Sequence, residues 1–106
     1  MNEHQIENYL CTQVKDKGGL ALKLNSTSMA GLPDRLVLFP DGFIYFVELK
    51  APGKKPRPLQ AAVHRRLKSL VFMVSVIDSK QQVNEFIEKV GTDGIYTTQV
   101  SGNSHK

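Results

Sequence analysis

The chain has 106 residues, which is enough for one compact domain and too few for two ordinary ones. Hydrophobic residues make up 41% of the chain and charged residues 23%, a composition that is typical of a globular protein and excludes a disordered one. The formal net charge of +4 and the pI near 9.3 favour an anionic partner such as nucleic acid, although many unrelated small proteins are also basic.

The cysteine and histidine content argues against a disulfide or a zinc site. Cys11 is the single cysteine, so no intramolecular disulfide can form, and the three histidines are not spaced as zinc ligands are. No apolar run approaches the roughly 18 residues that a membrane span needs, and the first residues do not resemble a signal peptide. We therefore expect a soluble protein of the reducing cytoplasm with no membrane partner.

The first part of the chain predicts a helix, a short strand and a loop. Over residues 3–17, apolar side chains recur every fourth residue, at Ile6, Leu10 and Val14. Gly18-Gly19 is a good terminator for this helix. Residues 20–24 alternate enough for a short strand, and residues 25–33 are rich in Ser, Thr and Gly and predict a loop.

The middle of the chain predicts a hairpin. Residues 35–39 and 43–50 are two apolar stretches, and the turn signal Pro40-Asp41-Gly42 lies between them. Residues 43–49 are apolar on both faces with the exception of Glu48. This pattern predicts a central strand that is covered on both sides.

The second half predicts a helix and a strand. Residues 51–58 contain one glycine and three prolines and are expected to be irregular. A helix is expected over residues 58–69, and its apolar stripe would consist of Leu59, Val63, Leu67 and Leu70. Residues 71–77 then predict a strand.

The last predicted element is a helix. Ser79 and Gln82 have the spacing of a capping box, and Gly91 would end the helix. Its buried face would consist of Val83, Phe86, Ile87 and Val90. Residues 92–100 could cover an edge of the core or join a partner, and residues 101–106 are expected to form a disordered tail. The order α-β-β-β-α-β-α predicts one α/β domain over residues 1–100, with a small mixed sheet flanked by helices.

Two carboxylates and a lysine are predicted to meet at the hairpin. Side chains alternate along a strand, so Glu48 and Lys50 project from the same side, and the hairpin can bring Asp34 alongside Glu48. Two adjacent carboxylates repel each other, and burial would push at least one toward its neutral form. Mg²⁺ would remove this conflict, because it prefers oxygen ligands and takes one or two protein carboxylates. The carbonyl of Leu49 could add another oxygen.

Lys50 has several chemical roles open to it in such a site. It could orient or deprotonate a water at the metal, or stabilise charge on a phosphate. A Glu-x-Lys sequence at a strand end is by itself usually a solvated pair. Here, however, it ends a continuous apolar strand, and a Gly-x-Pro-Asp sequence begins one hairpin upstream. The combination favours a functional site.

The stretches GLPDRLVLF and IYFVELKAPGKKPRPLQAAVHRRL resemble the VRR-NUC family of the PD-(D/E)xK nuclease superfamily. The resemblance covers about residues 3–90, and the motif positions are Gly31, Pro33, Asp34, Glu48, Lys50 and Gln60. It implies a restriction-endonuclease-like core. It also implies a dimeric endonuclease, similar to the stand-alone members of phages and bacteria, that uses Mg²⁺ or Mn²⁺ to cleave branched DNA such as four-way (Holliday) junctions. The compartment would then be the cytoplasm of a bacterium or of a phage-infected host cell.

The resemblance also implies a catalytic and metal-binding glutamate on the first helix. At about 100° per residue, Glu7 projects within about 20° of Val14 and borders the buried stripe. Glu3 lies on the same side but in the first turn, where helices fray. We favour Glu7, and the alternative is that it is an edge residue paired with a lysine.

Gln60 and His64 lie one helical turn apart and share a face. The resemblance places Gln60 in the active site, where its amide could hold the catalytic water or a phosphate oxygen. Gln60 could instead be a helix-cap or surface residue. His64 could contact a phosphate or relay a proton, or it could be only a helix-surface residue.

Basic residues are concentrated directly after the candidate strand. The cluster consists of Lys50, Lys54, Lys55, Arg57, Arg65, Arg66 and Lys68. We expect Lys54, Lys55, Arg57 and Arg65 to contact DNA phosphates, with His64 beside them and Lys23 on the preceding strand. A merely solvated basic loop is the alternative. No motif that reads base sequence is evident, so recognition by DNA shape and backbone is expected.

The sequence is therefore compatible with three functions. The first is a structure-selective DNA endonuclease, and the second is a nucleic-acid-binding module that keeps the nuclease fold without catalysis. The third is a metal-binding or protein-interaction domain with a coincidental motif. The set of Asp34, Glu48 and Lys50 favours the first function over the second, and the basic cluster favours both over the third.

Overall fold

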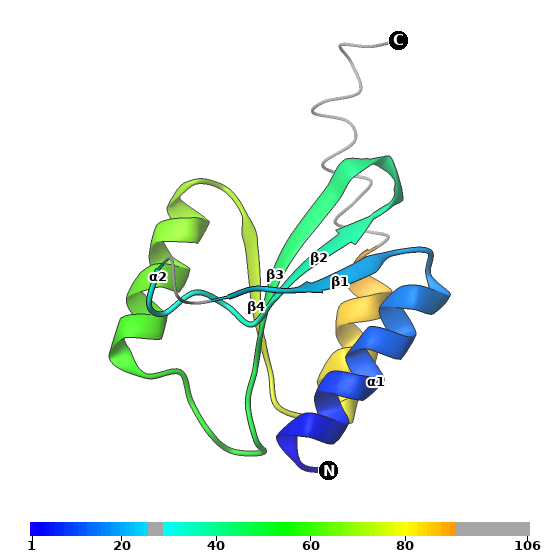
Figure 1. Ribbon diagram of the computed structural model, residues 1–106, viewed down its shortest axis with the longest axis horizontal. Helices are drawn as coiled ribbons and strands as arrows, with labels where there is room; N and C mark the ends of the chain where they lie inside the picture. The colour runs from blue at the N-terminus through cyan, green and yellow to red at the C-terminus, as the bar shows by residue number, and fades with distance from the viewer. Residues whose placement is uncertain (26–28, 91–106) are drawn as a thin grey trace, which may run out of the picture.

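The computed structural model describes residues 1–25 and 29–90, and Figure 1 shows how its elements are arranged. The elements are α1 (Glu3–Asp16), β1 (Leu20–Lys23), β2 (Arg35–Phe39), the 3₁₀ turn η1 (Pro40–Gly42), β3 (Phe43–Leu49), α2 (Pro58–Ser69), β4 (Met73–Ile77) and a helix over residues 80–90. This order confirms the predicted α/β class.

The strands form one mixed sheet in the order β1-β2-β3-β4. The first three strands are antiparallel neighbours, and the predicted hairpin joins β2 to β3. Strand β4 runs parallel to β3, with α2 as the crossover between them. In Figure 1, α2 lies on one side of the sheet, and α1 and the helix over residues 80–90 lie on the other. The end of β3 is therefore enclosed between two layers of helices.

Helix α1 begins and ends with local signals. Asn2 and Gln5 form a capping box, because each side chain accepts a hydrogen bond from the other residue's backbone N–H. Gly18, with φ +82, follows the helix in the left-handed conformation that glycine tolerates. The predicted apolar stripe is fully buried at Ile6, Leu10 and Val14. The helix thus presents one apolar face to the sheet.

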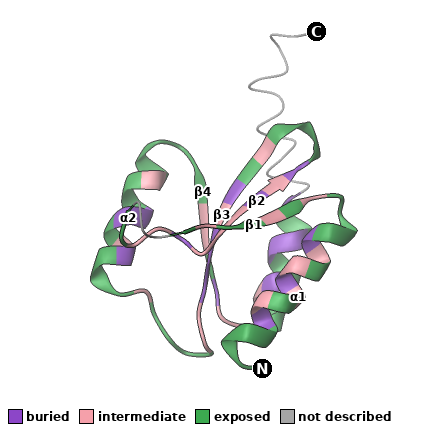
Figure 2. Cartoon of the chain, in the orientation of Figure 1, coloured by how far each residue is buried: buried purple, intermediate pink, exposed green. Residues whose placement is uncertain are grey.

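The hydrophobic core fills the layer between the sheet on one side and α1 and the helix over residues 80–90 on the other. Figure 2 shows buried residues along their inner faces. The predicted stripe of the last helix is buried at Val83, Phe86, Ile87 and Val90. Rings of Phe39, Tyr45 and Phe86 meet inside this core, with centroids 5.5 to 6.4 Å apart.

The other face of the sheet is covered only in part, which corrects two predictions. Residues 43–49 are not covered on both sides along their whole length, because Ile44 is 40% exposed. The α2 stripe is also incomplete, since Leu59 and Leu70 are exposed while Val63 is buried. The reason is that α2 is short and covers the end of β3 that carries Glu48, not its beginning.

Several predicted boundaries shift by one or two residues. Strand β4 begins at Met73, because Val71 has φ +73 and belongs to the turn that ends α2. Ser79 caps the last helix by accepting from the Gln82 N–H, but the Gln82 side chain accepts from Asp78 instead of closing a full capping box. The predictions for Gly91, for residues 92–100 and for the tail lie outside the described residues. Within the described ranges, no helix is long and apolar enough to cross a membrane.

Candidate active site

Strand register places Asp34 beside Glu48. Arg35 pairs with Val47 across the β2–β3 hairpin, so one further step places Asp34 opposite Glu48. The Asp34 carboxylate accepts a hydrogen bond from the Leu49 N–H at 2.8 Å through Oδ2. This bond fixes the Asp34 side chain at the end of β3.

The loop before Asp34 requires glycine at position 31. Gly31 has φ +88, and a Cβ there would lie 2.9 Å from Val63 Cγ2 and 3.1 Å from Leu59 Cγ. The loop therefore packs directly on α2, with Pro33 fully buried behind it. The Gly-x-Pro-Asp sequence is explained by this close approach, which holds Asp34 at the start of β2.

Gln60 joins the two charged residues at the end of β3. Its Nε2 donates to Glu48 Oε2 at 3.0 Å, and its Oε1 accepts from Lys50 Nζ at 2.9 Å. The same Oε1 accepts from the Arg57 N–H at the beginning of α2. Lys50 Nζ also lies 3.3 Å from Glu48 Oε2. The amide thus orients Glu48 and Lys50 through these protein contacts.

Glu48 is a buried acid in an unfavourable environment. Its residue exposure is 1%, and burial, with the negative charge of Asp34, raises its pKa to about 6. Lys50 opposes this effect by stabilising the carboxylate. Glu48 Oε1 is buried and has no hydrogen-bond partner among the described residues. An oxygen in this state calls for a cation or a donor.

The donors at this position fit a magnesium ion. Asp34 and Glu48 supply carboxylate oxygens, and the backbone of Leu49 lies between Glu48 and Lys50. Within the described part of the chain, no three His, Cys, Asp or Glu side chains are grouped to hold an ion by themselves. Mg²⁺ does not need such a group, because it keeps several waters and uses one or two carboxylates together with phosphate oxygens.

The helix acid favoured from the sequence is not brought to this cluster. Glu7 binds Arg35 through two hydrogen bonds of 2.8 and 3.0 Å, and Arg35 also donates to the Ala21 carbonyl. Arg35 faces α1, on the opposite side of the sheet from Glu48, as the strand register requires. The negative charge that reaches Glu48 from α1 is that of Glu3, which contributes to its raised pKa. Of the groups that shift that pKa, Glu3, the alternative, has the smallest effect, whereas Glu7 is paired with Arg35.

His64 is an interior residue, in contrast to the surface position considered for it. Its ring is 7% exposed, and its Nε2 lies 3.8 Å from Glu48 Oε1. Burial lowers its pKa, and so do the positive charges of Lys68 and Lys50. A direct contact with DNA phosphates does not fit this burial.

The other basic residues predicted to contact DNA are all exposed. They are Lys23, Lys54, Lys55, Arg57 and Arg65. Asp78 fixes the loop that carries the two adjacent lysines, because its carboxylate accepts from the Gly53 N–H at 3.1 Å. Asp78 is not among the site residues predicted from the sequence, although its position directly after a strand is a usable signal. The parallel pair of Leu49 and Ile77 brings it to the edge of the sheet where β3 ends.

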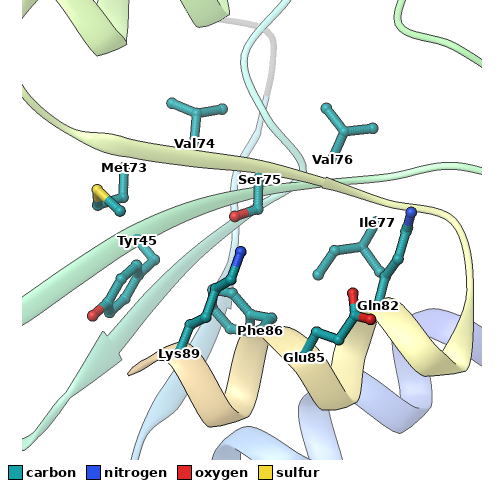
Figure 3. A pocket seen from close by; sticks show the side chains of 10 residues that line it. All are labelled: Tyr45, Met73, Val74, Ser75, Val76, Ile77, Gln82, Glu85, Phe86 and Lys89. Carbon is teal, nitrogen blue, oxygen red and sulfur yellow. The ribbon is translucent and has the colours of Figure 1, made fainter. Parts of the chain in front are cut away.

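A cavity of about 390 Å³ lies elsewhere, between β4 and the helix over residues 80–90. Figure 3 shows that Met73, Ser75 and Ile77 point toward the helix that carries Phe86. Its lining contains none of the predicted site residues. The cavity opens on the core face of the sheet, whereas Glu48 projects from the other face.

Comparisons with known proteins agree on one kind of protein, although no family model matches the chain. A protein of Acyrthosiphon pisum secondary endosymbiont phage 1, named "Putative nuclease p44", is 48% identical over 80 residues, which are 76% of this chain and 86% of that protein. A solved structure titled "VRR_NUC domain" is 37% identical, with a TM-score of 0.76. That match covers 81% of this chain and 94% of the solved chain.

Proposed function

The chain belongs to the VRR-NUC family of nucleases, and on this basis we propose that it is a metal-dependent endonuclease that hydrolyses phosphodiester bonds in DNA. Branched DNA such as four-way junctions is the proposed substrate. One observation carries the metal dependence: the buried acid Glu48 lies close enough to Asp34 for that negative charge to raise its pKa further. Two acids placed together in this way favour a divalent cation between them.

Asp34, Glu48 and the carbonyl of Leu49 are the proposed ligands of Mg²⁺, for which Mn²⁺ can substitute. A bound ion would polarise the scissile phosphate and make a water more acidic. The acid of α1 would act from the edge of this group, and the contribution of Glu3 to the raised pKa of Glu48 supports Glu3 for that role.

Lys50 is the proposed electrostatic partner of the phosphate. Its ammonium is held by the Gln60 amide and by Glu48, and its side chain is 16% exposed. A lysine ammonium has three N–H donors, so two protein acceptors fix its position and leave a third donor for a phosphate oxygen. A positioned donor of this kind can stabilise the negative charge that develops on phosphate oxygens. This arrangement favours charge stabilisation over proton abstraction by Lys50.

The exposed basic residues support DNA backbone recognition. Lys54 and Lys55 are carried by the loop that leaves the end of β3, and this loop is fixed by Asp78. Arg57 and Arg65 are exposed at the beginning and in the second half of α2. Contacts of this kind neutralise phosphates and recognise shape, and they do not read bases.

We further propose that the active species is a homodimer, because resolving a junction takes two cuts and one site makes one. Leu20, Leu22 and Ile44 are exposed on the sheet face that α2 leaves uncovered, and a second copy would cover apolar side chains of this kind. The measurement is molar mass in solution by light scattering, for the wild type and for Leu22→Glu. A monomeric wild type would contradict the dimer.

The cleavage test compares a four-way junction with a linear duplex of the same sequence. Each is incubated with Mg²⁺, with Mn²⁺ or with EDTA, and wild type is compared with Lys50→Ala. Metal-dependent cuts in the junction that are lost in the variant support the proposal. Binding without cuts would support a DNA-binding module of the same fold. If the protein binds neither DNA, both functions are contradicted.

A further inference from the structure

Two buried side-chain atoms of the described residues lack a hydrogen-bond partner, and they face each other. They are Glu48 Oε1 and His64 Nε2, and the distance between them is 3.8 Å. Both belong to side chains that are nearly fully buried, with exposures of 2% and 7%. Buried polar atoms without partners are rare, and each one calls for an explanation.

The two orphaned atoms are chemically complementary. An ionised carboxylate only accepts hydrogen bonds, whereas a neutral imidazole donates from whichever nitrogen carries its proton. A small side-chain shift would bring the Nε2–H of His64 within hydrogen-bond distance of Oε1. Nε2 carries a hydrogen in the imidazolium and in one neutral tautomer, so this contact does not depend on the charge of the ring.

The helix explains why this contact and that of Gln60 occur together. Gln60 and His64 are one turn apart on α2, so both project toward the end of β3. Gln60 already donates to Glu48 Oε2. A donor at Oε1 would hold the second oxygen, and a carboxylate with about four acceptor sites keeps capacity for a cation.

We propose that His64 is a positioning residue that fixes the Glu48 carboxylate through an Nε2–H···Oε1 hydrogen bond, so that Glu48 binds its metal ion in one orientation. This inference rests on the proposed function, which supplies the metal ion, and adds to it a role for His64 of α2. Carboxylates that bind metals are in general held by further hydrogen bonds from the protein. The loss of such a bond typically weakens metal affinity roughly 10- to 100-fold.

The hydrogen bond itself is tested without any metal. Protein labelled with ¹⁵N-histidine is studied by NMR in EDTA at neutral pH, and His64→Gln is used to assign the ring signals. The expected result is a protonated Nε2 and an unprotonated Nδ1 in His64, with an Nε2 shift that moves in Glu48→Gln. An unprotonated Nε2 would overturn the proposal, because that atom would then be an acceptor or a metal ligand.

The effect on the ion is tested by Mn²⁺ binding without DNA, measured by calorimetry or by electron paramagnetic resonance of free Mn²⁺. In His64→Phe, which keeps the ring volume but lacks a donor, we expect Mn²⁺ affinity to fall about 10-fold or more. His64→Gln places an amide nitrogen near the Nε2 position and should restore affinity to within about threefold of wild type. The exposed residue His4 supplies the control His4→Phe, which should bind Mn²⁺ as wild type does.

The metal-dependent function and the positioning role of His64 would fail in different ways. If wild type has the expected tautomer but binds no Mn²⁺, the proposed metal-dependent function fails and the hydrogen bond stands. If wild type binds Mn²⁺ and folded His64→Phe binds it equally well, the positioning role is wrong. Should the phenylalanine variant not fold, the tautomer of wild type and the affinity of His64→Gln still decide the question.

Discussion

Glu48 and Lys50 are held at a fixed spacing by one amide, because Gln60 donates to Glu48 at 3.0 Å and accepts from Lys50 at 2.9 Å. A direct contact between the two charges is longer, at 3.3 Å. The Glu48 carboxylate and the Lys50 ammonium are thus positioned by α2 and not only by the strand that carries them. Gln60 is therefore a positioning residue of the proposed site.

Gln60→Leu removes this amide while keeping similar volume. We expect cleavage to fall by roughly 10- to 100-fold, because Glu48 and Lys50 lose their common partner. Single-turnover rates on the junction measure the effect, and Gln81→Leu on the exposed face of the last helix is the matched control. A rate equal to that of wild type would contradict the role given to Gln60.

Glu48→Gln changes stability in a pH-dependent way in metal-free protein. Burial and Asp34 raise the pKa of Glu48 from 4.5 to about 6 in the folded state. Between these values the folded protein holds the proton more tightly than the unfolded chain, so the free energy of unfolding decreases as pH rises through this range. At about pH 7.5 the variant should be more stable than wild type, by on the order of 1–2 kcal/mol.

Urea unfolding in EDTA at about pH 7.5 and about pH 4.5 measures this difference, which should shrink at the lower pH, where Glu48 is protonated in wild type. A variant that is less stable at the higher pH would contradict the account. So would a difference that increases toward acid.

Two matched variants distinguish the roles of the two glutamates of α1. Glu7→Gln should lower the free energy of unfolding by about 1 kcal/mol, because it weakens a partly buried pair with Arg35. It should leave Mn²⁺ affinity unchanged. Glu3→Gln should do the reverse, with a several-fold loss of Mn²⁺ affinity and little change in unfolding. Loss of Mn²⁺ affinity in the Glu7 variant alone would restore Glu7 to the site.

Neutralising Lys54 and Lys55 together should weaken DNA binding and reduce its salt dependence. Each lost phosphate contact lowers the slope of log K against log salt by about 0.9, so a decrease of roughly 1–2 is expected. Lys15 and Lys17 form a matched pair of exposed lysines at the other end of α1 from Glu3. An equal loss in both double variants would place the DNA elsewhere.

Much of the fold follows from local patterns. The stripe of Ile6, Leu10 and Val14 and the turn signal between β2 and β3 predict elements that the structure contains, because side-chain periodicity and turn chemistry act over a few residues. Coverage of the sheet could not be predicted in this way. Ile44 is exposed because α2 is short, and that depends on how the layers meet.

The candidate site, like the fold, could be predicted from the sequence only in part. The register of one hairpin suffices to place Asp34 beside Glu48, so this pair could be predicted from the sequence. The pairing of Glu7 with Arg35 could not, because a helical projection gives the direction of Glu7 but not the strand that lies opposite it. Burial of His64 likewise depends on the packing of α2 against β3.

The central claim is that Asp34 and Glu48 together bind a divalent cation. A crystal of the wild-type protein soaked in Mn²⁺ and measured at the manganese absorption edge tests it directly, with Glu48→Gln as the control. The predicted result is an anomalous peak within ligand distance of both carboxylates that is lost or weakened in the variant. A wild-type map with no peak there, and with the two carboxylates apart, would contradict the account.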